Sequence, residues 1–243
     1  MIKVGVLGHG GRMGSAVCAA VESDDELDLV ARIGRGDSLD ALVAGGTEVA
    51  VEFTTPDCVA DNVRFCIEHG IRAVVGTTGL QAEDIDDLGR RAADRGIGVL
   101  IAPNFALGAV LMMRFAQKAA RFYEAAEIIE RHHDKKLDSP SGTALRTASL
   151  MNERRDTGWR APPGRETVAG SRGGDGDGVR IHSLRLPGSV AHQEVIFGGV
   201  GETLTIRHDS LDRSSFMPGV LLAVKRVDTL GGVTVGLEHL LEI

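Results

Sequence analysis

Hydrophobic residues in the first half of the chain form short runs separated by longer amphipathic stretches. The runs are rich in Val, Ile and Leu, as are the buried strands of a parallel sheet. This alternation predicts βαβ units and a Rossmann-like, doubly wound parallel sheet. We predict strands at 2–7, 27–33, 48–53, 72–75 and 98–102, and helices at 12–22, 56–69, 81–95 and 106–123.

The second half changes to an alternation of polar and apolar residues, which indicates strands with one covered face. A loop rich in Gly, Pro and charge, 156–178, interrupts it. We therefore expect a smaller α+β domain with an open mixed sheet, whose uncovered face favours self-association. The predicted strands are 127–131, 179–186, 190–197, 202–208 and 232–237, and the predicted helices are 143–153 and 214–227.

These elements predict two domains. Residues 1–128 are expected to form a dinucleotide-binding domain, and residues 129–213 a substrate-binding and oligomerisation domain. Residues 214–243 are expected to return to the dinucleotide-binding domain, because their helix and short strand continue its α/β pattern.

Composition and charge exclude several classes of partner. The 243 residues carry a formal net charge of −7, which argues against nucleic acid and anionic membranes but not against a small anionic substrate. No apolar run approaches the roughly 20 residues that cross a bilayer, and the N-terminus shows no signal-peptide pattern. Three cysteines without metal-like spacing indicate free thiols, so we expect a cytoplasmic protein.

A glycine-rich turn follows the first predicted strand and opens the first predicted helix. Glycines let a pyrophosphate pass close to the backbone, and the helix N-terminus offers free N–H groups. A merely tight turn would not need four glycines in seven residues. The predicted dinucleotide contacts in this turn are Gly8, His9, Gly10, Gly11, Arg12, Met13 and Gly14.

NAD sites place a carboxylate about 20 residues after this turn, where it binds the adenosine ribose. Counting from Gly14 reaches Gly34, which Arg32 and Arg35 flank. Without a carboxylate a 2′-phosphate meets no repulsion, and a guanidinium can pair with it. We predict that NADPH serves at least as well as NADH, with Arg35 as a contact, unless both arginines are solvated surface residues.

The residues that follow other predicted strands are further candidates, because ligands of open α/β sheets lie outside the carboxyl ends of the strands. Each segment could otherwise be only a βα turn. The predicted cofactor contacts there are Gly76, Thr77, Thr78, Ala102, Pro103, Asn104 and Phe105.

The segment 130–144 concentrates chemistry just ahead of a predicted helix. It holds two histidines, two lysines and a Ser-Gly-Thr turn, so it can give a proton and hold an anion. Ser141 fits an N-cap, and the free N–H groups of Gly142 and Thr143 would then form an anion seat.

Other interpretations of this segment remain. His132 and His133 could bind a metal, but adjacent strand residues point to opposite faces and no Cys or carboxylate cluster completes a ligand set, so no metal is predicted. Lys135 and Lys136 could be a solvated pair, with Lys135 the better candidate for that. Ser141 lacks the partners of a nucleophile.

Several blocks in the same order resemble the 4-hydroxy-tetrahydrodipicolinate reductase family, also called dihydrodipicolinate reductases, of lysine and diaminopimelate biosynthesis. The resemblance covers nearly the whole chain. It rests on residues 4–14, 53–54, 75–79, 102–105, 130–144, 191–195 and 201–210.

The resemblance implies an NADPH- or NADH-dependent oxidoreductase, a small dicarboxylate substrate and a homotetramer. It implies that His132 gives or takes a proton, that Lys136 donates one, and that His133 contacts the substrate. The substrate carboxylate would bind at Ser141, Gly142 and Thr143.

Three positions depart from the family pattern. Arg131 and Asp134 stand where an apolar and a less acidic residue are expected, and Glu52 stands where Asp is usual. The rival functions are a related small-molecule dehydrogenase for an amino acid or a sugar, a non-catalytic dinucleotide-sensing module, and a structural or interaction protein.

Overall fold

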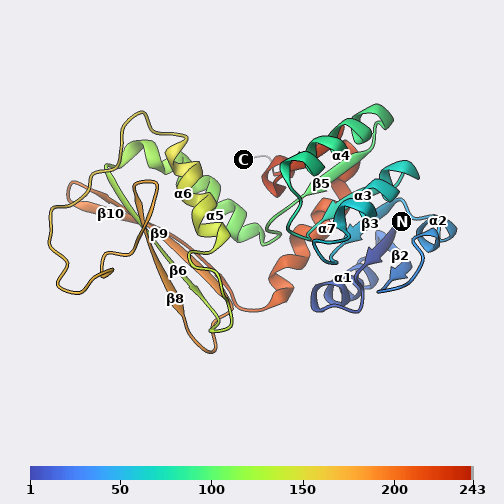
Figure 1. Ribbon diagram of the computed structural model, residues 1–243, viewed down its shortest axis with the longest axis horizontal. Helices are drawn as coiled ribbons and strands as arrows, with labels where there is room; N and C mark the ends of the chain where they lie inside the picture. The colour runs from blue at the N-terminus through green and yellow to red at the C-terminus, as the bar shows by residue number, and fades with distance from the viewer. Residues whose placement is uncertain (242–243) are drawn as a thin grey trace. The chain divides into compact units, whose positions relative to one another are not determined.

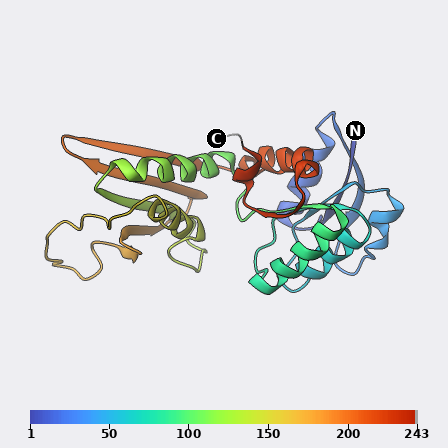
Figure 2. The same cartoon turned by 90° about the horizontal axis from the view of Figure 1, so that it is seen from above.

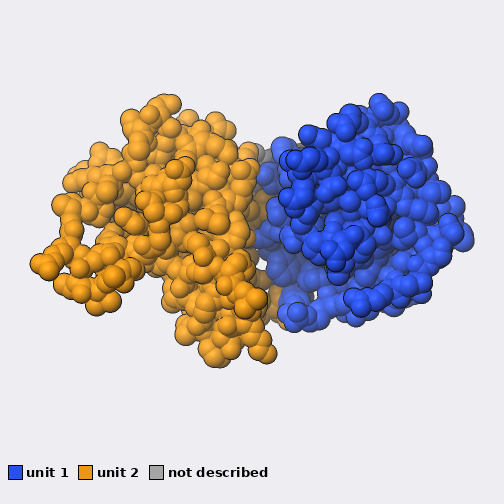
Figure 3. Space-filling model, viewed as in Figure 1, with its two compact units in different colours: residues 1–107, 213–243 blue, residues 108–212 orange. Residues whose placement is uncertain are grey.

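The computed structural model describes residues 1–241, which form two compact units. Of the described residues, unit 1 comprises 1–107 and 213–241, and unit 2 comprises 108–212 (Figure 3). The division at 107/108 lies before the expected boundary at 128. The reason is that Ala116 and Ala120, in the helix expected to end the first domain, belong to the core of unit 2.

Unit 1 is built on a six-stranded sheet in the order β11-β5-β4-β3-β1-β2, and all its strand pairs are parallel. Several strands are buried along most of their length, which explains their continuous apolar runs. The strands are β1 Ile2–Leu7, β2 Leu27–Ile33, β3 Val49–Glu52, β4 Arg72–Val75, β5 Gly98–Ile101 and β11 Gly232–Val235.

Helices connect these strands and cover the sheet (Figures 1 and 2). Their apolar stripes pack on the strands, as when Val63, Ile67 and Leu88 join a core with Val75 and Val99. The short helix α2 was not predicted, because one turn carries too little periodicity. The helices are α1 Arg12–Glu22, α2 Asp40–Ala44, α3 Val59–Glu68, α4 Ala82–Arg95 and α7 Met217–Arg226, with 3₁₀ turns at Arg213–Phe216, Val227–Thr229 and Leu237–Leu240.

Unit 2 contains a five-stranded mixed sheet in the order β10-β9-β6-β8-β7. The β6 and β8 strands are parallel, whereas the remaining pairs are antiparallel. The Rossmann-like sheet and the second mixed sheet confirm the predicted fold class. The strands are β6 Ala125–His132, β7 Gly174–Gly176, β8 Val179–Arg185, β9 Ala191–Gly199 and β10 Glu202–Ser210.

Two helices, α5 Leu107–Ala119 and α6 Gly142–Asn152, cover one face of this sheet. A 3₁₀ turn, Ala120–Phe122, continues α5. Along β6 the buried positions alternate, so that Ala126, Ile128 and Glu130 face the helices. Glu127, Ile129 and Arg131 alternate with them and lie on the opposite face, which no helix of the described residues covers.

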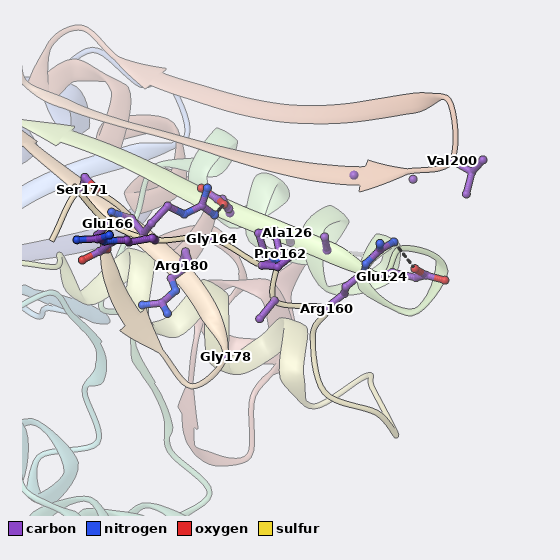
Figure 4. Close-up of a pocket in the computed structure, with 18 of the residues that line it drawn as sticks. Glu124, Ala126, Arg160, Pro162, Gly164, Glu166, Ser171, Gly178, Arg180 and Val200 are labelled. Carbon is purple, nitrogen blue, oxygen red and sulfur yellow. Dashed lines mark hydrogen bonds and ion pairs between the residues drawn. The ribbon is translucent and has the colours of Figure 1, made fainter. Parts of the chain in front are cut away.

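The segment from the end of α6 to β7 forms a wide loop at the edge of unit 2 (Figure 1). Between this loop and β6 lies a hollow of about 770 Å³ (Figure 4). Arg160, Arg172 and Arg180 line it together with Glu124 and Glu127. Within residues 1–241, no helix is both long enough and apolar enough to span a bilayer.

Candidate active site

Parallel strands bring the candidate cofactor residues to one edge of the unit 1 sheet. The glycine turn follows β1, Arg35 follows β2, Thr77 follows β4 and Asn104 follows β5. Since β5, β4, β3, β1 and β2 are successive neighbours, their carboxyl ends form a continuous rim. An open α/β sheet binds its ligands at such a rim.

The tight turn after β1 requires glycine at two positions. Gly8 has a φ of +82°, and a Cβ there would lie 2.1 Å from the carbonyl oxygen of Phe53. A Cβ on Gly14 would lie 2.1 Å from the carbonyl oxygen of Gly8. Any larger residue would push the turn away from α1 and β3, so these positions require glycine.

The N-terminus of α1 is open to an anion. Gly11 is its N-cap and makes no side-chain hydrogen bond to the first turn, so the helix keeps free N–H donors beside an exposed Arg12. The turn and the helix end together fit the pyrophosphate of a dinucleotide.

The end of β2 differs from its sequence prediction. Arg32 pairs with Glu22, whereas Arg35 is exposed and forms no ion pair with another described residue. The N–H of Gly34 donates to Asp37 Oδ2 at 2.8 Å. Asp37 therefore places a carboxylate beside Gly34, although Gly34 itself has none. The fixed spacing of the dinucleotide motif did not predict this carboxylate, because Asp37 lies three residues further along the chain.

A buried carboxylate ties the ends of β3 and β4 together. Glu52 is 1% exposed, and its Oε1 accepts hydrogen bonds from the Thr54 hydroxyl and from Asn62 Nδ2 at 3.2 Å. The N–H of Thr54 in turn donates to Thr77 Oγ1 at 2.7 Å. Glu52 Oε2 makes no hydrogen bond within the described residues.

The segment after β5 is fixed by backbone contacts. The N–H of Ala102 donates to the carbonyl of Val75 at 2.9 Å, and Asn104 Oδ1 accepts from the N–H of Ala106 at 2.9 Å. The rings of Phe105 and Phe53 lie 5.7 Å apart between centroids. Ala102, Pro103, Asn104 and Phe105 thus form an ordered turn beside Gly76, Thr77 and Thr78.

In unit 2 a second buried carboxylate, Glu130 of β6, contacts the candidate residues His132 and Ser141 and is 0% exposed. Arg185 of β8 donates to both of its oxygens, each at 2.9 Å. His132 Nδ1 lies 2.6 Å from Glu130 Oε2, and the N–H of Ser141 donates to Oε1 at 3.2 Å.

Charged donors keep Glu130 ionised despite its burial. Burial alone would raise the pKa of Glu130, but hydrogen bonds from His132 and Arg185 lower that pKa to about 2. Arg185 Nη2 also donates to the carbonyl of Asp138 at 2.7 Å. The guanidinium therefore joins the carboxylate to the loop that carries Lys136.

That loop holds Lys136 between β6 and α6. The N–H of Lys136 donates to the carbonyl of His133 at 3.2 Å, and its Nζ lies 2.8 Å from both carboxylate oxygens of Asp138. The ammonium lowers the pKa of Asp138 through this contact. His133 and Lys135 are exposed.

The predicted N-cap is present at the start of α6. Ser141 is its N-cap, and the Ser141 Oγ accepts from the N–H of Ala144 at 3.2 Å. Thr147 donates to the carbonyl of Thr143 at 2.7 Å, and Gln193 donates to Thr147 at 2.8 Å. The N–H groups of Gly142 and Thr143 remain free to bind an anion.

Two family models cover nearly all of the chain. The N-terminal model of dihydrodipicolinate reductase matches residues 2–105, and the C-terminal model matches residues 108–241. The chain belongs to the dihydrodipicolinate reductase family. Reductases of this family use NAD(P)H.

Individual members are similar over their full length. The 4-hydroxy-tetrahydrodipicolinate reductase of Nocardia farcinica (strain IFM 10152) is 57% identical, covering 100% of this chain and 99% of the relative. That of Corynebacterium diphtheriae is 54% identical, with the same coverage of both chains. A dipicolinate-bound dihydrodipicolinate reductase from Paenisporosarcina sp. TG-14 superimposes with a TM-score of 0.92, at 38% identity, over 99% of this chain and 100% of the other.

Arg131 and Asp134, two of the residues expected to depart from the family pattern, make no side-chain hydrogen bond or ion pair with Glu130 or Arg185 in the described residues. Arg131 lies on the sheet face opposite Glu130, where it lines a small hollow with His192 and Arg207. Asp134 is exposed in the loop. Within residues 1–241 no three His, Cys, Asp or Glu side chains are grouped so that they could hold a metal ion.

Sequence reasoning missed Glu130, Arg185 and Gln193 as parts of this reductase site. Glu130 belongs to the segment 130–144. Its position two residues before His132 on a strand places both side chains on one face of the sheet. Gln193 lay inside the resembling block 191–195, whereas Arg185 lay in none. Neither could be placed in the site, because only the pairing of β8 and β9 with β6 brings them there.

Proposed function

We propose that this chain reduces 4-hydroxy-tetrahydrodipicolinate to tetrahydrodipicolinate with NAD(P)H and releases water. The observation that carries the proposal is the cluster in unit 2. A free helix N-terminus at Gly142 and Thr143, a histidine held by an ionised carboxylate, and Lys136 all lie within one segment. This set can bind a carboxylate and supply protons to a reduced ring.

The roles follow from the chemistry of each group. The turn from Gly8 to Gly14 and the start of α1 would hold the pyrophosphate, and the cofactor would supply hydride. The N–H groups of Gly142 and Thr143 would bind a substrate carboxylate at the positive end of α6. The Lys136 ammonium would leave Asp138 to face the substrate and donate a proton, while His132 exchanges protons at Nε2.

NADPH oxidation in the presence of enzymatically generated substrate tests this proposal. We expect Lys136→Ala to lower kcat by about 10²-fold or more, with the KM for NADPH nearly unchanged. Lys135→Ala is the matched control, because its side chain is exposed in the same loop. Wild-type kcat in Lys136→Ala would refute the role of this lysine, and no turnover by the wild type would favour a dinucleotide-sensing module.

Thr143→Ala tests the anion seat separately. The backbone N–H remains, but the variant loses the Thr143 hydroxyl, which could donate a second hydrogen bond to the carboxylate, so the KM for substrate should rise more than kcat falls. Competitive inhibition by pyridine-2,6-dicarboxylate should weaken in parallel. An unchanged inhibition constant would place the carboxylate elsewhere.

The cofactor preference rests on Arg35, which is exposed and unpaired among the described residues. Its guanidinium can pair with a 2′-phosphate, whereas Asp37 beside Gly34 favours a ribose hydroxyl. We infer that NADPH serves at least as well as NADH. Comparing kcat/KM for both cofactors in the wild type, Arg35→Ala and Asp37→Asn tests this, and a strong wild-type preference for NADH would refute it.

Unit 1 is proposed as the dinucleotide-binding domain and unit 2 as the substrate-binding and oligomerisation domain. The uncovered, charged face of the unit 2 sheet and the wide loop beside it support a homotetramer, which light scattering of the purified chain would measure. Three free cysteines support a cytoplasmic location. Nothing in the charge of the chain calls for a nucleic acid or a membrane partner.

A further inference from the structure

One buried ion pair in unit 2 contacts His132, the start of α6 and the loop that carries Lys136. Glu130 and Arg185 share two hydrogen bonds of 2.9 Å, and Glu130 is fully buried. Each partner also reaches beyond the pair. Glu130 contacts His132 and the N–H of Ser141, and Arg185 contacts the carbonyl of Asp138.

The carboxylate decides which nitrogen of His132 carries the proton. An ionised carboxylate only accepts hydrogen bonds, so the nitrogen 2.6 Å from Glu130 Oε2 must be Nδ1–H. In the neutral imidazole Nε2 is then the unprotonated nitrogen. It makes no hydrogen bond to another of the described residues, so it is the nitrogen free to exchange a proton with a ligand.

The same pair fixes the two backbone segments that flank the site. The Ser141 N–H lies directly before the free donors of Gly142 and Thr143, so its bond to Glu130 fixes the start of the anion seat. The Asp138 carbonyl lies two residues after Lys136, so its bond to Arg185 fixes the loop that carries the ammonium.

We propose that Glu130 and Arg185 are positioning residues of the reaction, which present His132 through Nε2 and hold the Lys136 loop and the start of α6 in one fixed geometry. This proposal rests on the proposed function of the site.

Stability alone does not account for this arrangement. A buried ion pair is often no more stabilising than apolar side chains of the same volume, and the neighbouring positions Ile128 and Ile181 of the paired strands are apolar. The titratable side chains that face the pair are His132 from β6 and Asp138 with Lys136 from the loop. All three belong to the segment proposed to carry the chemistry, which a purely structural ion pair would not require.

Glu130→Gln tests the proposal, because it keeps the shape and removes the charge. Arg185 then competes with His132 for a single oxygen, and the amide nitrogen offers His132 a donor instead of an acceptor. Replacing the Asp of a protease Ser-His-Asp triad by Asn costs about 10⁴-fold in kcat through the wrong tautomer. We expect a fall of about 10²-fold in kcat here, with the KM for NADPH unchanged.

The second readout is ¹⁵N NMR of the full chain labelled in histidine, with the His132 signal assigned by comparison with His132→Gln. The wild type should show only the Nδ1–H tautomer, and Glu130→Gln a mixture. Arg185→Lys keeps the charge but loses the two-pronged contact, so it should retain the tautomer and lose about tenfold in kcat.

Glu153→Gln is the matched control. Glu153 accepts from Arg146 and Gln117 at the other end of α6, so its variant should keep both the tautomer and kcat. Wild-type kcat in a folded Glu130→Gln, or an Nδ1–H tautomer that persists in it, would overturn the proposal. If the wild type turns over no substrate, the proposed function fails, whereas the tautomer measurement still decides what Glu130 does to His132.

Discussion

Unit 1 and unit 2 each contain a glutamate that is almost fully buried near the end of a strand. These are Glu52 in unit 1 and Glu130 in unit 2, and their surroundings differ. Glu52 receives hydrogen bonds from a hydroxyl and an amide, and one of its oxygens makes none within the described residues. Glu130 receives hydrogen bonds from a guanidinium, an imidazole and a backbone N–H.

The two carboxylates have different hydrogen-bond partners because the two sites are built from different chemical groups. The rim of unit 1 uses backbone groups and glycine turns, so its carboxylate only has to tie the loops after β3 and β4 together. The unit 2 cluster uses charged side chains, so its carboxylate must orient charge, and a cationic partner offsets the cost of burying it. Neutral donors fix geometry, whereas charged donors also fix the ionisation state.

The largest expected effect comes from removing the cation. Arg185→Met would leave Glu130 buried without its guanidinium, and breaking such a pair costs about 3–5 kcal/mol of unfolding free energy. Trp159 is the one tryptophan of the chain, and it packs near Phe197 in the core of unit 2. Its fluorescence during urea unfolding therefore reports on unit 2.

The control for this measurement is Arg146→Met. Arg146 pairs with Glu153 while its side chain is 51% exposed, so its loss should change the unfolding free energy by less than about 1 kcal/mol. Equal effects of the two substitutions would mean that burial adds nothing to the Glu130 pair.

The second-largest expected effect is the loss of unfolding free energy at acid pH. The pKa of Glu130 is lowered to about 2 from 4.5, so its ionisation stabilises the folded state above pH 4.5, and this contribution is lost as the pH falls towards 2. Between pH 6 and pH 3 the wild type should lose about 2 kcal/mol more than Glu130→Gln. Urea unfolding of both at each pH, followed by Trp159 fluorescence, measures the difference, and parallel pH dependences would contradict the low pKa.

The two regions were not equally accessible to sequence reasoning. The unit 1 rim follows from the chain alone, because each candidate stands directly after an apolar strand and parallel strands align their ends. The glycine turn and the segments after β4 and β5 lie where the pattern predicted. Asp37 was not predicted, because it lies outside the spacing of the motif and only its side chain returns to Gly34.

In unit 2 the local part of the site could be predicted from the sequence, whereas most of the residues that support it could not. Ser141 as an N-cap needs only its neighbours in the chain, and it was predicted. Arg185 lies 55 residues from Glu130, and the distance is closed by the parallel pairing of β6 with β8 across a long loop. The domain boundary was misplaced for a related reason: the pattern of α5 shows an apolar face but not which sheet that face covers.

The smallest effect concerns the neutral partners of Glu52. Asn62→Leu keeps the number and branching of the side-chain heavy atoms, but removes the donor to Glu52 Oε1 and its contact with the Thr54 hydroxyl. The Thr54 hydroxyl remains, so the loss should be only about 1 kcal/mol of unfolding free energy. Because Trp159 and Tyr123 both lie in unit 2, hydrogen exchange of the β3 and β4 amides is the suitable measurement.

Asp61→Asn is the control on the same helix, since Asp61 is 79% exposed and pairs with Arg64; it should change the unfolding free energy by less than about 0.5 kcal/mol. The Asn62→Leu variant should also raise the KM for the cofactor slightly, because Thr54 holds Thr77 through its N–H. A loss as large as that of Arg185→Met would show that Glu52 depends on its neutral donors as strongly as Glu130 depends on a cation, and the distinction between the two carboxylates would fail.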